Sequence, residues 1–523
     1  MSRPLYPQLW VLSSQYSITR VAKQLKDIEG IEPSGLQHLR TLFLDTVDWR
    51  LYRKGLALQA SQNDEGWQLK LLKLTSGKIL AMSPVDALPE YTEDIPEGVL
   101  ANKLYKLVFP RVLSQICEIE IKRHQYVCLD NEGKQYLRIF LDQPKSNLPG
   151  KAQTTKLPNC IVIEPIQGYE KESIPLINQL INQFGLNEKK SSLLFDCITG
   201  WNIESNLKGN KLQFHLDGED SNDRALKRIF LLLLDMMCAN ENGLMAQKDP
   251  EFLHDYRIAL RRCRTLLGQA KQCISPDKLE SVEQELVWLG SLTGPARDYD
   301  VMLLELPLYQ TLLPACDSED FSPLESYLRE QQQHTYQTLI EALHGQRYTT
   351  FKQSWMKLLD SNDLQLWGNA AKKTIREFAT TRIGKAYKRV LSDGKSIGTG
   401  SAIEAYHKLR KSCKKLRYLM EMFSELYPSK KIKTLIKELK KLQDNLGELQ
   451  DLEVHSEILQ NFLMQRTTVN ENNQQAENAV RQLIERNDMR KQDIINHFLA
   501  SFASFSSKKN KKLFTDLLGM KHL

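Results

Sequence analysis

Two stretches of the chain, 153 residues apart, place a histidine ahead of basic residues at matching spacing. His254 and His407 are each followed by a cation at positions +3, +7, +8 and +10. These cations are Arg257, Arg261, Arg262 and Arg264 in the first stretch and Arg410, Lys414, Lys415 and Arg417 in the second. Guanidinium and ammonium groups bind phosphate oxygens through charge-assisted hydrogen bonds. The duplicated pattern therefore predicts binding of a polyvalent anion.

Both stretches have the spacing of amphipathic helices, because offsets 0, +3, +7 and +10 fall within an arc of roughly 80°. No acid occurs from residue 256 to 272 or from 405 to 420, although exposed helices usually alternate acids and bases. We interpret each stripe as an anion-binding surface, with a solvated face or pairing to distant acids as the alternative. The opposite, apolar faces hold Tyr256, Cys263, Leu266 and Leu267, and Leu409, Leu416, Leu419, Met420 and Phe423.

Each histidine stands where we expect its helix to begin, and two roles are open to it. One is packing or capping, and the other is a proton-donating contact with phosphate, whose charge favours the imidazolium form. A second motif also recurs 153 residues apart, and we interpret both copies as junctions between helices rather than metal loops. The copies are Gly294, Arg297, Asp298 and Asp300, and Gly447, Gln450, Asp451 and Glu453.

Length and composition limit the class of protein. A chain of 523 residues exceeds what one core usually supports, so we expect two or three domains. The net charge of +7 is modest, so any basic surface must be local. The apolar runs are shorter than a membrane span, and the N-terminus lacks a signal core, so we expect a cytosolic protein without a membrane partner. The 9 cysteines contain no C-x-x-C pair, which indicates buried, reduced thiols.

The pattern of apolar and polar residues changes near residue 205. Before it, alternating runs predict an α+β domain with an antiparallel sheet, with strands at 41–45, 67–72, 118–122, 136–141 and 160–164, helices at 17–26 and 172–184, and a hairpin loop at 131–133. After residue 221, we predict helices at 223–238, 250–271, 276–292, 298–306, 324–343, 375–391, 402–426, 431–446, 449–464 and 475–501. The repeat predicts tandem duplication of a helical bundle, and the lysine-rich segment 508–512 is predicted to be a solvated tail.

From about residue 219 to the C-terminus the chain resembles the CHAD family, the conserved histidine α-helical domain. The resemblance rests on the two histidine-led helices and on segments 294–301 and 442–452, in the right order. It implies two pseudo-symmetric four-helix bundles, about 219–370 and 371–523, with a basic groove or pore that binds inorganic polyphosphate. The implied contacts are His254, Arg257, Arg261, Arg262, Arg264, His407, Arg410, Lys414, Lys415 and Arg417, with Lys227, Arg228, Lys385 and Lys388 as weaker candidates.

Residues 9–201 resemble a CYTH (triphosphate tunnel) domain, chiefly through segment 41–58. That family carries an E-x-E-x-K motif on its first strand, but here the corresponding residues 8–13 include no acid. Glu118, Glu120 and Lys122 match the motif on a later strand, where alternate residues share a face. Gln59 and Ala60 replace expected arginines. We therefore expect residues 1–205 to form a degenerate partial barrel without triphosphatase or cyclase activity.

These inferences predict a polyphosphate-binding protein, possessing no catalytic activity and no metal or cofactor, that associates with polyphosphate granules. One alternative is a Mg²⁺- or Mn²⁺-dependent phosphohydrolase acting on short polyphosphates through Glu118, Glu120 and Lys122. Another is nucleic-acid binding through the same basic helices. The second is less favoured because the stripes lack interleaved aromatic residues that would stack on bases, with only Tyr418 close by.

Overall fold

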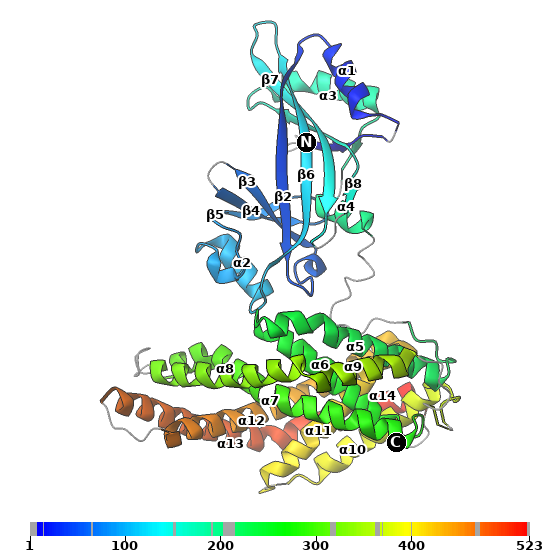
Figure 1. Cartoon of the computed structure of the whole chain (residues 1–523), viewed down its shortest axis with the longest axis vertical. Coiled ribbons are helices and arrows are strands. Elements are labelled where there is room, and N and C mark those ends of the chain that lie inside the picture. The colour runs from blue at the N-terminus through cyan, green and yellow to red at the C-terminus, as the bar shows by residue number, and fades with distance from the viewer. Residues whose placement is uncertain are drawn as a thin grey trace. The chain divides into compact units, whose positions relative to one another are not determined.

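The computed structural model describes residues 8–13, 15–63, 66–149, 153–189, 192–201, 215–313, 321–360, 367–368, 370–398, 400–465 and 471–519. The chain divides into two compact units, Met1–Lys211 and Leu212–Leu523. Figure 1 shows that the first unit carries the strands and the second is helical. No helix in the described part of the chain combines the length and apolar character that a membrane span needs.

The first unit is built on one antiparallel sheet, as predicted. Its strands are β1 (Gln8–Val11), β2 (Ile31–Asp45), β3 (Leu56–Asn63), β4 (Gly66–Lys73), β5 (Ile79–Val85), β6 (Ser114–Leu129), β7 (Gln135–Asn147), β8 (Thr154–Lys156), β9 (Cys160–Pro165) and β10 (Asn187–Glu188). Its helices are α1 (Ile18–Lys26), α2 (Val99–Val108), α3 (Glu170–Phe184) and α4 (Leu193–Gly200). The strand order is β10-β1-β9-β7-β6-β2-β3-β4-β5, with β8 beside β7.

The predicted strands are confirmed, but the strands of the structure are longer. Segment 41–45 is the buried end of β2, whose preceding residues are largely exposed and therefore carry no alternation of apolar and polar residues. The hairpin loop between β6 and β7 is also confirmed. The Asp130 carboxylate accepts backbone N–H bonds from Glu132 (2.9 Å) and Lys134 (2.8 Å). Gly133 has φ +75°, a conformation that glycine adopts without strain.

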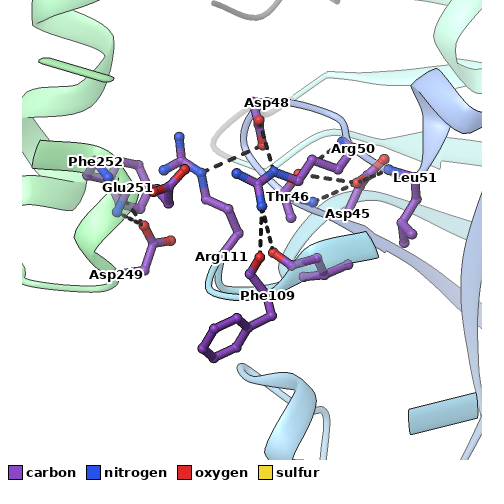
Figure 2. Close-up of polar contacts among 11 residues, drawn as sticks. Asp45, Thr46, Asp48, Arg50, Leu51, Phe109, Arg111, Asp249, Glu251 and Phe252 are labelled. Carbon is purple, nitrogen blue, oxygen red and sulfur yellow. Dashed lines mark hydrogen bonds and ion pairs between the residues drawn. The ribbon is translucent and has the colours of Figure 1, made fainter. Parts of the chain in front are cut away.

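Asp45 organises the turn after β2. It is 1% exposed and accepts backbone N–H bonds from Thr46 (2.7 Å), Leu51 (3.0 Å) and Tyr52 (2.9 Å). Figure 2 shows its contacts with Thr46 and Leu51. Burial raises the pKa of Asp45 to about 6, although the N–H donors favour its ionised form. This carboxylate is therefore a structural element of the turn.

The second unit consists of two repeats of helices. The first contains α5 (Asn222–Met245), α6 (Pro250–Gln269), α7 (Pro276–Leu312), α8 (Ser322–His344) and α9 (Gln346–Asp360). The second contains α10 (Ile375–Lys395), α11 (Ile403–Met422), α12 (Ser429–Gln465), α13 (Glu471–Phe505) and α14 (Lys508–Leu518). The first and last residues of α11 lie 153 positions after those of α6, and the same holds for α12 relative to α7. The duplication predicted from the sequence is confirmed.

Corresponding helices of the two repeats contact each other. α5 packs on α10, α6 on α11, α7 on α12 and α8 on α13, which is the arrangement that a pseudo-two-fold axis produces. Figure 1 shows α8, α12 and α13 running alongside one another. At this end the two repeats share one core, to which they contribute Tyr309, Leu324, Phe462 and Val480.

Two predicted helix boundaries are wrong. α7 continues through Gly294 and Pro295, and α12 continues through Gly447, so the recurring motif lies inside long helices and not at junctions. An internal proline removes one helical hydrogen bond and costs roughly 3 kcal/mol. Residues on either side of it, including Leu289 and Ala296, are fully buried, and this packing offsets the cost.

The C-terminal lysine-rich segment and α9 are two further differences. Lys508 begins α14 and so is not in a solvated tail, because Phe514 and Leu517 anchor this helix in the core. The Phe514 ring stacks on Tyr387 of α10 at 3.7 Å between centroids. α9 was not predicted, although Phe351 and Trp355 mark its buried face.

The cysteines behave as expected within the described residues. Cys117, Cys128, Cys160, Cys197, Cys238, Cys263, Cys273 and Cys413 are free thiols, and all but the partly exposed Cys238 are buried. Cys316 lies outside the described residues. Burial raises the pKa of the Cys263 thiol to about 12, so this thiol is unreactive at neutral pH.

Gly394, in the last turn of α10, allows a close helix contact. A Cβ atom at this position would lie 2.0 Å from Cε2 of Phe502, a side chain of α13 that is 7% exposed. We expect Gly394→Ala to destabilise the helical unit by about 1–3 kcal/mol through overpacking, despite the better helix propensity of alanine. Gly398→Ala is the control, because nothing lies within 4 Å of its added methyl group. Thermal unfolding measures both, and an unchanged melting temperature for Gly394→Ala would contradict the expectation.

Candidate anion-binding site

The two basic helices begin before their histidines. α6 starts at Pro250, and its N-cap residue is Asp249, whose carboxylate accepts the backbone N–H groups of Glu251 (2.9 Å) and Phe252 (3.2 Å), as Figure 2 shows. α11 starts at Ile403 without a side-chain capping bond. His254 and His407 each lie four residues into their helix and are partly exposed. The capping role considered for them is therefore wrong.

The apolar faces predicted for these helices are buried, which orients the basic stripes. Tyr256, Cys263, Leu266 and Leu267 of α6 are at most 2% exposed, and Leu409, Leu416, Leu419 and Met420 of α11, with its C-cap residue Phe423, are fully buried. Residues on a helix point in directions set by its 3.6-residue period, so burial of one face fixes where the cations point.

The basic stripes of α6 and α11 together contribute four cations that lie near one another. We call these residues the cationic quartet: Arg257, Arg261, Arg410 and Lys414. Arg261 corresponds to Lys414 in the repeat, and Arg257 corresponds to Arg410. Burial, followed by the charges of Arg410 and Arg261, lowers the pKa of Lys414 to about 7. Burial and the charge of Arg261 lower the pKa of Arg257 to about 10. Four cations from the two repeats therefore lie within electrostatic reach of one another.

Two carboxylates, again repeat counterparts, lie near the quartet. Asp451 of α12 is 3.5 Å from Arg410, and its counterpart Asp298 of α7 interacts electrostatically with Arg257. Burial raises the pKa of Asp298. Nε of Arg410 is buried without a hydrogen-bond partner among the described residues, and Nη1 of Arg257 donates to Oγ1 of Thr293 at 3.0 Å. Asp300 and Arg297 also interact electrostatically with Arg257, so three acids only partly offset five cations.

Glycines in α7 make room for the arginines of α6. A Cβ at Gly290 would lie 2.6 Å from Nη1 of Arg264, and a Cβ at Gly294 would lie 3.7 Å from Nη1 of Arg257. These two glycines are four residues apart and so share a helix face. Both arginines thus lie against α7, where the sequence analysis had expected the helix to end.

Arg262 and Arg417 both pair with an acid that the sequence analysis missed. Nη2 of Arg262 donates to Oε2 of Glu421 at 2.9 Å, and Nε of Arg417 lies 3.4 Å from Oε1 of the same carboxylate. Glu421 is the first acid beyond the acid-free stretch and stands four residues after Arg417, a spacing that could have identified the pair.

The remaining candidates are more dispersed. Lys415 is exposed on α11, with Arg382 and Arg389 of α10 and Lys271 as its charged neighbours. Arg228 pairs with Asp220 at 3.0 Å. Lys227 is partly exposed on α5, whereas Lys385 and Lys388 are exposed on α10.

The acidic candidates of the first unit lie on one face of β6. Glu118, Glu120 and Lys122 alternate with the buried residues Ile119 and Ile121, as expected for a strand. Glu118 accepts a 2.5 Å hydrogen bond from Nε of Arg40, whereas Glu120 and Lys122 are exposed. Among the described residues there is no group of three or more His, Cys, Asp or Glu side chains able to hold a metal.

The second unit is therefore an all-α domain in which two repeats meet at a cationic cluster. Residues 228–460 match the family model of the CHAD domain. This part of the chain is a CHAD domain, which confirms the resemblance noted in the sequence.

Comparison with individual proteins adds several relatives. Two uncharacterized proteins from Mycobacterium tuberculosis strains are each 29% identical over 178 residues, or 32% of this chain. The chain spans about a third of the length of these curated relatives. The CHAD domain from the plant Ricinus communis is 24% identical and has a TM-score of 0.47, with 57% of this chain and 96% of that chain covered.

The first unit also has structural neighbours. An adenylate cyclase-type protein from Bacillus halodurans aligns with the N-terminal part at 15% identity and a TM-score of 0.24, covering 36% of this chain and 92% of that chain. The family-model match alone identifies residues 228–460 as a CHAD domain.

Proposed function

We propose that the protein binds inorganic polyphosphate at the cationic quartet and performs no chemistry on it. The observation that carries the proposal is the convergence of Arg261 with Arg410 and Lys414 from the opposite repeat. Like charges brought together and partly desolvated raise the free energy of the folded protein. A polyanion at this position would remove the repulsion and supply hydrogen-bond acceptors to all four side chains.

Condensed phosphate suits this arrangement better than a nucleic acid does. Its negative charges are closely spaced along a flexible chain, and it needs no stacking surface. Tyr418, the aromatic residue nearest the stripes, is 5% exposed and lies beside Arg262 and Arg417. It is therefore not available to stack on a base. The CHAD family resemblance implies the same ligand.

Titration of the full chain with polyphosphate of defined length, with and without Mg²⁺, tests the proposal. We expect retention without release of phosphate, and an affinity that falls with salt at a slope of about 0.7 per neutralised phosphate, or roughly 3 for four contacts. Failure to bind at low salt would contradict it. Phosphate release that requires Mg²⁺ and is abolished by Glu118→Gln would favour the phosphohydrolase alternative. We expect association with polyphosphate granules in the cytoplasm and no requirement for a metal or cofactor.

A further inference from the structure

The residues on the two sides of the quartet do not follow the pseudo-two-fold symmetry. Arg262 and Lys415 are repeat counterparts, so a symmetric site would treat them alike. Arg262 is paired with Glu421, but the counterpart of Glu421 is Gly268, which has no side chain. The two flanks of the quartet therefore differ in charge.

The flank at Glu421 is closed. Its carboxylate bridges Arg262 of α6 and Arg417 of α11, at 2.9 Å and 3.4 Å. Both guanidinium carbons lie over the ring of Tyr418, at 6.0 Å and 5.6 Å from its centroid. The Arg262 side chain is only 11% exposed. A phosphate at these arginines would compete with a carboxylate that already pairs with both.

The flank at Lys415 is open and cationic. Lys415 is exposed, and burial of part of its chain together with Arg382, Arg389 and Lys271 lowers its pKa. Nη2 of Arg382 donates to Oε1 of Gln272 at 3.2 Å, which holds this guanidinium beside the segment that carries Lys271. Lys415 and Arg382 form no ion pair with any residue that the structure describes.

Acids near this flank are fewer than the cations. Glu283 is 3.7 Å from Lys271, and Asp393 is 3.0 Å from Arg389 and 3.6 Å from Lys408. These two carboxylates partly neutralise the outer cations. Lys415 and Arg382 therefore have no carboxylate partner among the described residues and are available to an external anion.

We propose that a phosphate chain bound at the quartet continues toward Lys415, Arg382 and Lys271, and not toward Glu421. This inference rests on the proposed function and adds a second phosphate subsite to it. A short chain occupies the quartet alone, whereas a longer chain also reaches the second subsite. The protein therefore binds long phosphate chains more tightly than short ones. The bound chain extends from the quartet on the Lys415 side only.

The test compares tripolyphosphate with long-chain polyphosphate on the full-length protein. We expect the double variant Arg382→Gln and Lys415→Gln to bind long chains about tenfold or more weaker, with a salt slope lower by about 1.4. Its affinity for tripolyphosphate should stay unchanged. The matched control removes two positive charges from ion pairs on α8 and α13, as Arg329→Gln and Arg481→Gln, and should bind both ligands normally.

A second variant tests the flank at Glu421. Glu421→Gln releases Arg262 and Arg417, so it should tighten long-chain binding and partly restore it in the Arg382→Gln, Lys415→Gln background. Equal loss for both ligands in the double variant, or no loss for either, would overturn the second subsite while leaving the quartet intact. Failure of the unmodified protein to bind either ligand would overturn the proposed function itself. Circular dichroism confirms that each variant is folded.

Discussion

Polyphosphate binding is expected to weaken by about a hundredfold or more when Arg261 and Lys414 are both replaced by glutamine. Each charge-assisted hydrogen bond to phosphate contributes about 1.5–3 kcal/mol, and two are removed. These residues are repeat counterparts that interact electrostatically, so the change removes one quartet cation from each repeat. Binding at low salt, where screening is weak, is the measurement.

The same double variant is expected to be more stable than the unmodified protein without ligand. Burial and the charges of Arg410, Arg261 and Arg417 disfavour the charge of Lys414 more than Asp451 favours it, so neutral glutamines relieve repulsion. Lower affinity combined with a higher melting temperature would show that Arg261 and Lys414 bind the ligand and do not stabilise the fold. The Arg329→Gln, Arg481→Gln protein serves as the charge-matched control. Unchanged affinity at low salt would mean that the quartet is merely solvated.

The sequence sufficed to predict the duplicated helices and the direction of their basic faces. The recurrence at 153 residues and the helical spacing of the cations can both be recognised from the order of residues along the chain. Which cations stay available could not be predicted, because that depends on how α6 and α11 cross. The crossing brings Arg262 to Glu421, an acid 159 residues away in the chain, and leaves Lys415 exposed.

Gly290 and Gly294 illustrate a second limit. Glycine followed by proline ordinarily indicates a turn, and the sequence analysis ended a helix there. In the structure these glycines instead let Arg264 and Arg257 lie against a continuous helix. Local propensity cannot distinguish a turn from a close approach, since only the partner helix decides between them.

Polyphosphate binding is also expected to weaken as the pH rises above about 7, by up to tenfold per pH unit. Lys414 has an ordinary pKa of 10.5, and in the folded protein burial, Arg410 and Arg261 lower it to about 7. Arg417 of the same helix adds to this effect, and Asp451 of α12 opposes it. Phosphate binds the ammonium form, so above that pH binding must take up a proton. Calorimetric titrations in buffers of different ionisation enthalpy measure this uptake.

Stability should depend on pH with the opposite sign. Between about 7 and 10.5 the unfolded chain holds the Lys414 proton and the folded chain does not, so the free energy of unfolding rises with pH across this window. Lys414→Arg is the matched control, because it keeps the charge without titrating in this range. Titration of the ligand's own end groups affects both proteins equally. If Lys414→Arg retains the full pH dependence of binding, Lys414 is not the group whose titration controls binding.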